Sequence, residues 1–160
     1  MLTLRTIQPQ DNQVVKKLIL QVMGEFGCLG EGFSSSDAEL DDMHTAYRSP
    51  GSAFYVLTDE SGTVVGTGGY GPLPGATGVC ELRKMYLLNE VRGKGGGKRI
   101  LNACLGSARG AGYRQMYLET VEQMTRAAVL YTSYGFAPLS GPLGRTGHCG
   151  CDRFLVKELA

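Results

Sequence analysis

The apolar residues of this chain recur with a helical period in some segments and cluster in short runs in others. Apolar residues three or four positions apart predict amphipathic helices whose apolar sides face a common core. Two such stripes are Val15, Leu18, Ile19, Val22 and Phe26, and Ile100, Leu101, Cys104, Leu105 and Ala108. Gly27 follows the first stripe, and Gly110 and Gly112 follow the second, as expected where helices end.

Two further helices are predicted from the residues at their ends. Ser36, with Glu39 three residues later, has the spacing of a capping box, which predicts a helix that runs to about Tyr47. Another helix is predicted from Met124 to Tyr134, because Gly135 follows it at the position of a left-handed cap.

Short runs of strand-forming residues separate these helices. They are bounded by glycine and proline, and the segment 60–62 between two of them has the composition of a hairpin turn. The predicted strands are 2–7, 53–58, 63–70, 79–88, 116–120, 136–139 and 153–159. The predicted order is therefore β-α-α-β-β-β-α-β-α-β-β. Since no linker, repeat or low-complexity tract interrupts it, we expect residues 1–160 to form a single mixed α/β domain.

The composition is that of an ordinary folded domain. The 160 residues are 42% hydrophobic and 19% charged, which suffices to bury a core. A net charge of +1 offers no overall attraction to nucleic acid or to a membrane surface. The five cysteines lack framework spacing, no secretory signal opens the sequence, and no apolar run reaches the roughly 20 residues of a membrane span. These features predict a cytoplasmic protein in a reducing compartment.

Glycine is in clear excess, with 24 residues in the chain. Four of them fall in the segment Arg92-Gly93-Lys94-Gly95-Gly96-Gly97-Lys98, between a predicted strand and a predicted helix. Free amides and the dipole at a helix start attract anions, and glycine lets the backbone approach them closely. Because Arg92, Lys94, Lys98 and Arg99 add positive charge, the segment is predicted to bind a phosphate-bearing ligand.

Two common nucleotide motifs do not fit this segment. A Walker A loop ending at Gly97-Lys98 requires glycine at position 92 and Ser or Thr at position 99, and both positions hold arginine. A dinucleotide fingerprint starting at Gly93 or Gly95 requires glycine at position 98 or 100, which hold Lys98 and Ile100. A nucleotide-binding module is therefore disfavoured.

The segment does contain R-x-x-G-x-G, formed by Arg92, Gly95 and Gly97. This motif resembles the pyrophosphate loop of the GCN5-related N-acetyltransferase (GNAT) family. The segment Met85-Tyr86-Leu87 resembles the family's strand before the loop, whose open backbone groups bind pantetheine. The resemblance covers roughly residues 54–136 and includes a later pattern, A-x-x-L-Y-x-x-x-G-F, formed here by Ala127, Leu130-Tyr131 and Gly135-Phe136.

The resemblance implies the GNAT fold, a mostly antiparallel mixed sheet that is splayed at the cofactor site and flanked by helices. It also implies acetyl-CoA as the acetyl donor. The cofactor-binding residues expected from it are Met85, Tyr86, Leu87, Arg92, Gly93, Lys94, Gly95, Gly96, Gly97 and Lys98. Met124 stands where the family often has asparagine, and Asn89-Glu90 where proline is common, so one side-chain contact to the cofactor is expected to be absent or replaced.

Acetyl transfer from a thioester to an amine needs a base for the amine, a donor for the developing oxyanion and an acid for the departing thiolate. The resemblance implies direct attack within a ternary complex and matches Tyr131 to the family tyrosine that protonates the thiolate. Tyr131 also lies on an apolar helix side and could simply pack there, which leaves Tyr134 as a rival. The oxyanion donor is expected to be a backbone N–H near Met85.

Glu81 is the candidate base, because it lies on the same predicted strand, just before the cofactor-binding part. It could act directly or through water, and the alternative is a structural carboxylate paired with Arg83. Glu119, at the end of the next strand, is the weaker candidate.

A group with metal-ligand side chains, His148, Cys149 and Cys151, lies near the C-terminus. It has no second cluster elsewhere, and C-x-C alone lacks zinc spacing. We therefore expect no metal site, but a loop with partly buried thiols that could still touch the acceptor.

The acceptor is expected to be an amine of a small molecule or a peptide. Residues 18–47 contain no lysine or arginine but six acids, so an acidic lining for a cationic acceptor is one hypothesis, with ordinary helix-start acids as the alternative. Transfer of another acyl group and a non-catalytic acetyl-CoA sensor also remain open. A homodimer is expected from the resemblance.

Overall fold

A single sheet organises the computed structural model, which describes residues 1–33 and 37–159. Within these residues the strands are β1 (Thr3–Thr6), β2 (Ala53–Thr58), β3 (Val64–Pro72), β4 (Val79–Leu87), β5 (Gln115–Thr120), β6 (Ala137–Pro138) and β7 (Arg153–Glu158). The helices are α1 (Asn12–Glu25), α2 (Met43–Ala46), α3 (Gly96–Gly110) and α4 (Thr125–Ser133), with short 3-10 helices η1 (Pro9–Asp11), η3 (Ala38–Asp41) and η4 (Asn89–Val91). The element order expected from the sequence is confirmed.

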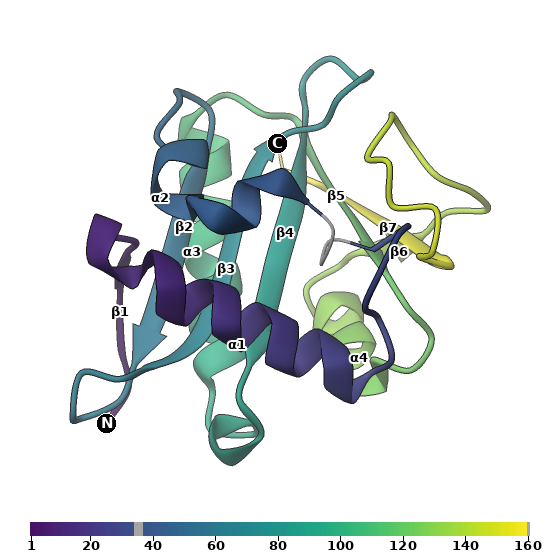
Figure 1. Cartoon of the computed structure of the whole chain (residues 1–160). Coiled ribbons are helices and arrows are strands. Elements are labelled where there is room, and N and C mark those ends of the chain that lie inside the picture. The colour runs from purple at the N-terminus through teal and green to yellow at the C-terminus, as the bar shows by residue number, and fades with distance from the viewer. Residues whose placement is uncertain (34–36, 160) are drawn as a thin grey trace.

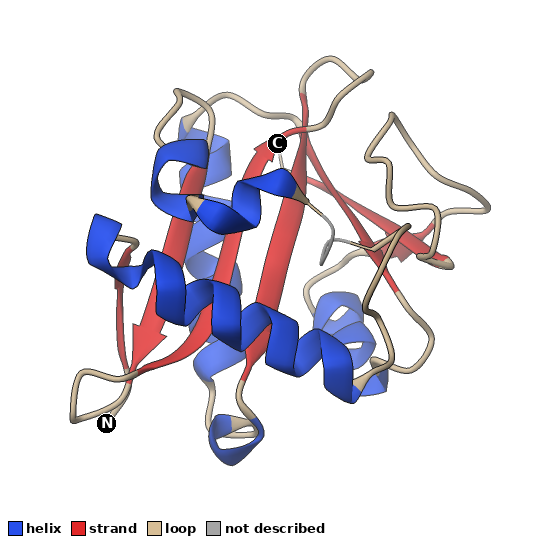
Figure 2. Cartoon of the chain, in the orientation of Figure 1, coloured by secondary structure: helices blue, strands red, loops and turns tan. Residues whose placement is uncertain are grey.

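The sheet has the order β1-β2-β3-β4-β5-β7-β6 in the described residues. All neighbouring strands are antiparallel except β4 and β5, which are parallel. Helices α1 and α2 cover one face of the sheet and α3 covers the other (Figures 1 and 2). The mostly antiparallel mixed sheet with flanking helices is the fold expected from the sequence.

Both apolar stripes read from the sequence are buried against this sheet, except for Phe26, which follows α1 and is half-buried. Val15 and Ile19 of α1 have no exposed surface and pack in one core with Phe54 and Val56 of β2. The α3 stripe packs in a second core, on the other face, with residues such as Leu82. Burying an aliphatic side chain of this size contributes about 1.5–3 kcal/mol, so the stripes hold the helices in place.

Strands β4 and β5 pair over only three residues and then separate. The paired positions are Val79 with Gln115, Cys80 with Met116 and Glu81 with Tyr117. Beyond Glu81 the two strands diverge, and α4 lies beside the diverging part (Figure 1). The part of β4 that carries Met85, Tyr86 and Leu87 is therefore not paired with β5, which is the splay expected from the sequence.

A bulge interrupts β4 within this open part. The pairing with β3 shifts between Thr67, opposite Tyr86, and Gly69, opposite Arg83. Lys84 lies inside the shift with φ of 51°, the one positive value among the described residues other than glycine. The Thr67 hydroxyl donates to the Lys84 carbonyl at 2.8 Å, which holds the bulge. Bulges re-aim the side chains beside them, here those of Arg83 and Lys84.

The second predicted helix is wrong in extent. In place of one helix up to Tyr47, the structure has η3 followed by the four-residue α2. Asp42 starts the new helix, because its side chain accepts from the Thr45 amide at 3.1 Å and from the Asn12 side chain at 2.8 Å. The expected cap at Ser36 lies outside the described residues. None of the described helices is both long and apolar enough to cross a membrane.

We expect Ile100→Ala to lower the free energy of unfolding by about 2–5 kcal/mol, the cost of a cavity in a core. Ile100 is fully buried on α3, and a methyl group on Gly68 of β3 would collide with it, so the helix lies directly on the sheet. Urea denaturation measures the change. Val129→Ala, at a side chain that is 71% exposed, is the matched control and should change the value by less than about 0.5 kcal/mol. Equal effects of the two substitutions would contradict the packing argument.

Candidate active site

A cleft of about 560 Å³ lies where β4 and β5 separate. Its walls come from the open part of β4, the start of α3, the end of α1 and the first turns of α4. The expected cofactor-binding residues that line it are Met85, Tyr86, Leu87, Arg92, Gly93, Gly95, Gly97 and Lys98. Residues distant in sequence thus meet in one space of the size expected for a cofactor.

The glycine-rich segment forms the N-terminus of α3. Gly95 caps the helix with φ of 84°, a left-handed conformation that favours glycine, and Gly93 has φ of 79°. A methyl group on Gly95 would meet no atom within 4 Å, so this backbone is open to a ligand. The first amides of the 15-residue helix α3 have no carbonyl partner within it, and its dipole adds partial positive charge. The geometry is that of an anion site.

Two of the expected cofactor residues do not line the cleft. Gly96 is buried, and a methyl group there would lie 2.6 Å from Leu57 Cδ2, so this glycine serves the packing of α3 on the sheet. Lys94 lines a different pocket, together with Arg99 and the chain start. The proposed contacts are therefore restricted to the residues that line the cleft.

Arg92 lines the cleft but is already engaged. Its Nε donates to the Leu87 carbonyl at 2.9 Å, and its Nη2 pairs with Glu25 of α1 at 3.0 Å. The guanidinium carbon lies 5.6 Å from the centre of the Phe26 ring. Arg92 thus ties the loop to the end of α1 and brings positive charge to the cleft.

Arg126 also lines the cleft, in the first turn of α4, although the sequence argument did not single it out. A methyl group on Gly93 would lie 3.8 Å from its Nη1, so its guanidinium is close to the loop. The local motif could not reveal it, because α4 is brought to the loop by the tertiary fold.

A second, smaller pocket of about 60 Å³ adjoins the cleft. Both spaces are lined by Met85, Tyr86, Met124 and Tyr131. The small pocket is further lined by the polar residues Glu81, Arg83, Lys84, Glu119, Thr120 and His148. We call it the inner pocket. The four shared residues form a junction between the two spaces, and Tyr131 is part of it.

Tyr131, which the resemblance matches to the family's acid, lines both the cleft and the inner pocket. The side chain is buried between cleft and inner pocket, with its ring centre 5.8 Å from that of Phe136. Burial raises the pKa of the Tyr131 phenol, which keeps the proton on the oxygen. The rival, Tyr134, lines neither of these two spaces.

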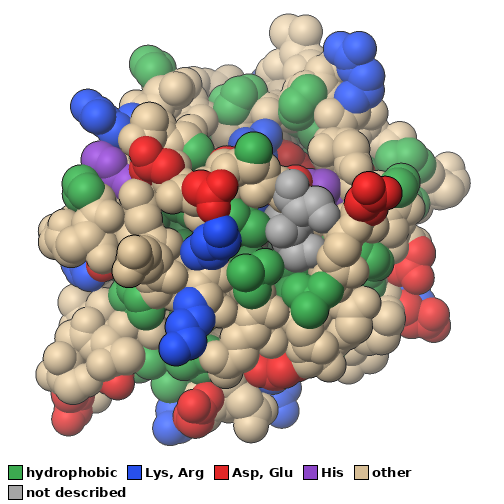
Figure 3. All heavy atoms as spheres, in the orientation of Figure 1, with side chains coloured by type: hydrophobic (Ala, Val, Ile, Leu, Met, Phe, Trp, Pro, Cys, Tyr) green, Lys and Arg blue, Asp and Glu red, His purple; other side chains and the backbone are tan. Residues whose placement is uncertain are grey.

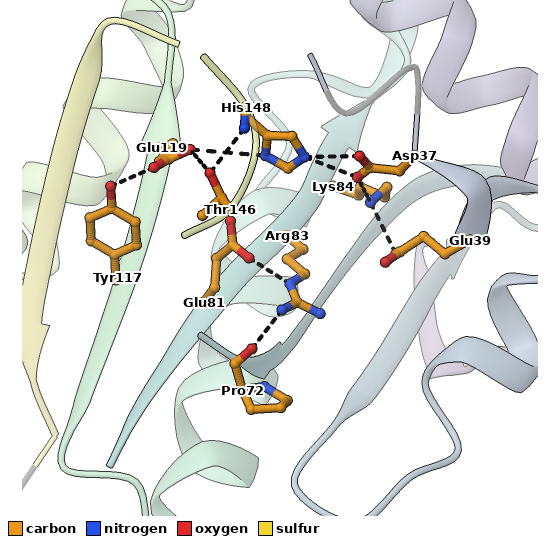
Figure 4. A network of polar contacts seen from close by, with 10 residues as sticks. All are labelled: Asp37, Glu39, Pro72, Glu81, Arg83, Lys84, Tyr117, Glu119, Thr146 and His148. Carbon is orange, nitrogen blue, oxygen red and sulfur yellow. Dashed lines mark hydrogen bonds and ion pairs between the residues drawn. The ribbon is translucent and has the colours of Figure 1, made fainter. Parts of the chain in front are cut away.

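Glu81 lies in the inner pocket and is bound to Arg83. The Arg83 Nε donates to Glu81 Oε1 at 2.7 Å, and the Arg83 Nη2 donates to the Pro72 carbonyl at 2.7 Å (Figure 4). Burial raises the pKa of Glu81, and the charge of Arg83 opposes that shift without cancelling it. The ion pair between Glu81 and Arg83, which the sequence offered as the alternative to a base role for Glu81, is therefore present.

Lys84, at the bulge, is the centre of a buried charge network (Figure 4). Its side chain is 1% exposed and pairs with Asp37 at 2.8 Å and Glu39 at 3.0 Å. The His148 Nε2 contacts both Asp37 oxygens, at 3.0 and 3.1 Å. The hydrogen bond to Asp37 raises the pKa of His148, although burial alone would lower it. Burial alone would raise the pKa of Asp37, but His148 and Lys84 lower it.

Glu119, the weaker base candidate, is held on both oxygens. It accepts from Tyr117 at 2.6 Å and from Thr146 at 2.5 Å, and its Oε1 lies 3.9 Å from the His148 Nδ1. The ligand-type atoms of Glu81, Glu119 and His148 lie within 4.8 Å of one another. Cys149 and Cys151 are not in this group; Cys151 is half-buried, as expected, but Cys149 is exposed.

The loop that carries His148 reaches the inner pocket, as the sequence hypothesis allowed. His148 and Cys151 both line it. Sequence reasoning missed Asp37, Lys84 and His148 as a unit, because they come from three segments far apart in the chain.

The acidic stretch of residues 18–47 contributes only part of its charge to this region. Asp37 and Glu39 line an outer pocket of about 280 Å³ that shares Glu81, Arg83 and His148 with the inner one. Asp41 pairs with Lys16, and Asp42 caps α2. On the molecular face shown in Figure 3, acidic and basic side chains are interspersed and form no acidic patch.

Comparison with known proteins agrees with this geometry. Residues 21–136 match the family model described as the acetyltransferase (GNAT) family. The uncharacterized N-acetyltransferase YjgM of Escherichia coli (strain K12) is 38% identical over 158 residues, which cover 98% of this chain and 94% of that protein.

Solved structures share the fold. The GNAT-family acetyltransferase of Staphylococcus aureus Mu50 superposes with a TM-score of 0.84 at 18% identity and full coverage of both chains. The structure of yncA from Salmonella typhimurium, with its cofactor acetyl-CoA, has a TM-score of 0.78 at 20% identity and covers 99% of this chain and 94% of its own.

We expect Gly95→Val to weaken binding of acetyl-CoA, the ligand expected from the loop motif, by about 100-fold or more, roughly 3 kcal/mol. A β-branched residue is strained at a φ of 84° and would fill the open approach to the helix amides. Isothermal titration calorimetry measures the affinity. Gly106→Ala, in the same helix with ordinary φ and open space around it, is the control and should bind acetyl-CoA as the unmodified chain does. Unchanged binding by Gly95→Val would refute the loop assignment.

Proposed function

Because the chain belongs to the acetyltransferase (GNAT) family, we propose that it transfers the acetyl group of acetyl-CoA to a primary amine by direct attack in a ternary complex. As a member of this family it is an acetyl-CoA-dependent N-acetyltransferase, with acetyl-CoA as donor. The observation that carries the proposal is the junction at Tyr131, where the cleft meets the small inner pocket with its buried charged side chains. A donor in one space and an acceptor in the other can react only there.

The cleft fits the chemistry of coenzyme A along its length. The α3 amides, with Lys98 and the nearby Arg92 and Arg126, offer positive charge to the pyrophosphate. The edge of β4 that β5 leaves after Glu81 offers backbone groups near Met85 to the amides of the pantetheine arm. Met124, at the position where the family often has asparagine, lines the junction with an apolar side chain.

We assign the acid role to Tyr131. Its phenol stays protonated because burial raises its pKa, and it lies at the junction where the thiolate departs. We assign stabilisation of the developing oxyanion to a backbone N–H of β4 near Met85, because the pairing with β5 ends before this point.

The acceptor is proposed to be a small molecule or peptide with a slender primary amine. A space of about 60 Å³ holds the amine end and little more, while the outer pocket can take the rest of the molecule. The hypothesis of a cationic acceptor rests only on Asp37, Glu39 and the buried Glu81 and Glu119. Lys84, Arg83 and His148 offset much of that negative charge.

The proposal is tested with a panel of primary amines and acetyl-CoA, with release of the free thiol as the readout. The panel includes amino acids, polyamines, aromatic amines, aminoglycosides and a lysine peptide. We expect amine-dependent thiol release with at least one class. Tight acetyl-CoA binding without thiol release for any amine would instead support the sensor hypothesis, and faster turnover of propionyl-CoA would support transfer of another acyl group.

We expect Tyr131→Phe to lower kcat by about tenfold to a thousandfold, the usual range for losing a general acid. Acetyl-CoA affinity should change little, because the substitution removes one hydroxyl and leaves the cleft intact. Steady-state kinetics with the best amine of the panel measures kcat. Tyr134→Phe, at the residue that follows the same helix and outside both spaces, is the matched control and should retain kcat. An unchanged kcat for Tyr131→Phe would move the acid role to another group.

A further inference from the structure

We infer that His148, oriented by Asp37, is the base that takes the proton of the acceptor ammonium in the acetyl transfer proposed above. His148 lines both the inner pocket, which it shares with Tyr131, and the outer pocket. It therefore stands between the reaction junction and the way out to solvent. Its side chain is only 14% exposed.

The two ring nitrogens of His148 have different surroundings. Nε2 lies 3.0 and 3.1 Å from the two oxygens of Asp37, so it carries a hydrogen and donates it. Nδ1 then holds the lone pair. It faces the Glu119 carboxylate at 3.9 Å, beyond hydrogen-bonding distance, and accepts no hydrogen bond from the described part of the chain (Figure 4). A carboxylate that fixes the tautomer and orientation of an imidazole is the arrangement that makes the other nitrogen a base.

Asp37 is itself held in place. Lys84 donates to its Oδ2 at 2.8 Å, and Lys84 is fixed by the β4 bulge. The His148 loop is anchored from the other side, because its amide donates to the Thr146 hydroxyl at 3.1 Å and Thr146 donates to Glu119 at 2.5 Å. A further bond from the Gly150 amide to the Gly32 carbonyl, at 2.8 Å, joins this loop to the segment after α1. The imidazole is thus oriented by groups from four segments.

Glu81, the base suggested by the sequence, is less free to act. Its Oε1 is bound by the Arg83 Nε at 2.7 Å, and both side chains are largely buried. Protonation of Glu81 would leave the Arg83 charge without its partner, and losing one member of a buried pair is costly. His148 meets no such obstacle, since Asp37 stabilises the imidazolium that forms. A base is also more effective when its pKa lies near the working pH, as that of a histidine does.

The proton balance is complete with the groups present. An N–H bond of the ammonium breaks, its proton bonds to His148 Nδ1, and the nitrogen keeps the electron pair. The nitrogen then bonds to the acetyl carbon, the carbon–sulfur bond breaks, and the sulfur takes the proton of Tyr131. A second proton of the nitrogen restores the Tyr131 phenol. The imidazolium releases its proton to solvent, so one ammonium and one thioester give one amide, one thiol and one proton.

This assignment fixes the direction of the pH dependence. The charged groups that face His148 are Asp37 and Glu39 from the segment after α1, Glu81, Arg83 and Lys84 from β4, and Glu119 from β5. Asp37 raises the pKa of His148 above its usual value of 6.5. The base works when unprotonated, so kcat/KM should increase with pH through that raised pKa.

The experiment measures kcat/KM against pH with an acceptor whose amine titrates above the range used. We expect the acid limb of the profile to disappear in His148→Gln and kcat to decrease by about 100-fold or more. The affinity for acetyl-CoA should not change. Added imidazole should restore part of the activity of His148→Ala. Asp37→Asn should move the limb to lower pH. His44→Gln is the matched control, since His44 lies on α2 outside all of these pockets, and it should keep the unmodified profile.

A near-normal kcat and an intact acid limb in His148→Gln would overturn the inference, and loss of the limb in Glu81→Gln instead would return the base role to Glu81. A second measurement keeps His148 in place, so that misfolding of a His148 variant does not affect it. The pKa of the His148 imidazole is measured by NMR in the His44→Gln chain. Its midpoint should equal that of the kinetic limb, and a mismatch refutes the assignment. If the unmodified chain acetylates no amine, the proposed function fails, a result distinct from failure of His148 alone.

Discussion

The early end of the pairing between β4 and β5 is the constraint on which the rest of the site depends. Three paired positions hold the strands together, and after Glu81 the two strands part. An exposed row of backbone donors and acceptors inside a fold is costly unless something pairs with it. In this chain the open row borders a long cleft, and α4 brings Tyr131 into the gap. A ligand rich in amides, such as pantetheine, can pair with backbone groups of β4 in this gap.

A buried charge couples the donor side of the site to the acceptor side. Lys84 lies at the bulge of the strand that borders the cleft, and its ammonium is satisfied by Asp37 and Glu39 from the segment after α1. A buried ammonium without such partners costs several kcal/mol, so the bulge and that segment stabilise one another. Through Asp37 the same network reaches His148. Strand, segment and C-terminal loop therefore form one electrostatic unit around the inner pocket.

Sequence reasoning succeeded where the signals were local. The stripes of α1 and α3 and the turn before β3 depend on residues a few positions apart, and the elements they predicted are confirmed. The helix expected up to Tyr47 failed because Asn12, thirty residues away, binds Asp42 and helps it to start a separate helix. Lys94 and Gly96 were assigned to the cofactor loop from their sequence position alone. In the fold, Lys94 lines another pocket and Gly96 is buried against the sheet.

The sequence by itself determined the order of elements, the family and the glycine-rich start of α3, because each rests on short-range patterns of apolar, glycine and basic residues. Only the tertiary structure decided which groups meet in the inner pocket. Four segments must meet to bring together Asp37, Lys84, Glu119 and His148. Glu81 and Arg83 form an ion pair that β4 buries. Charge and pKa depend on such neighbours in space, and a linear pattern does not contain them.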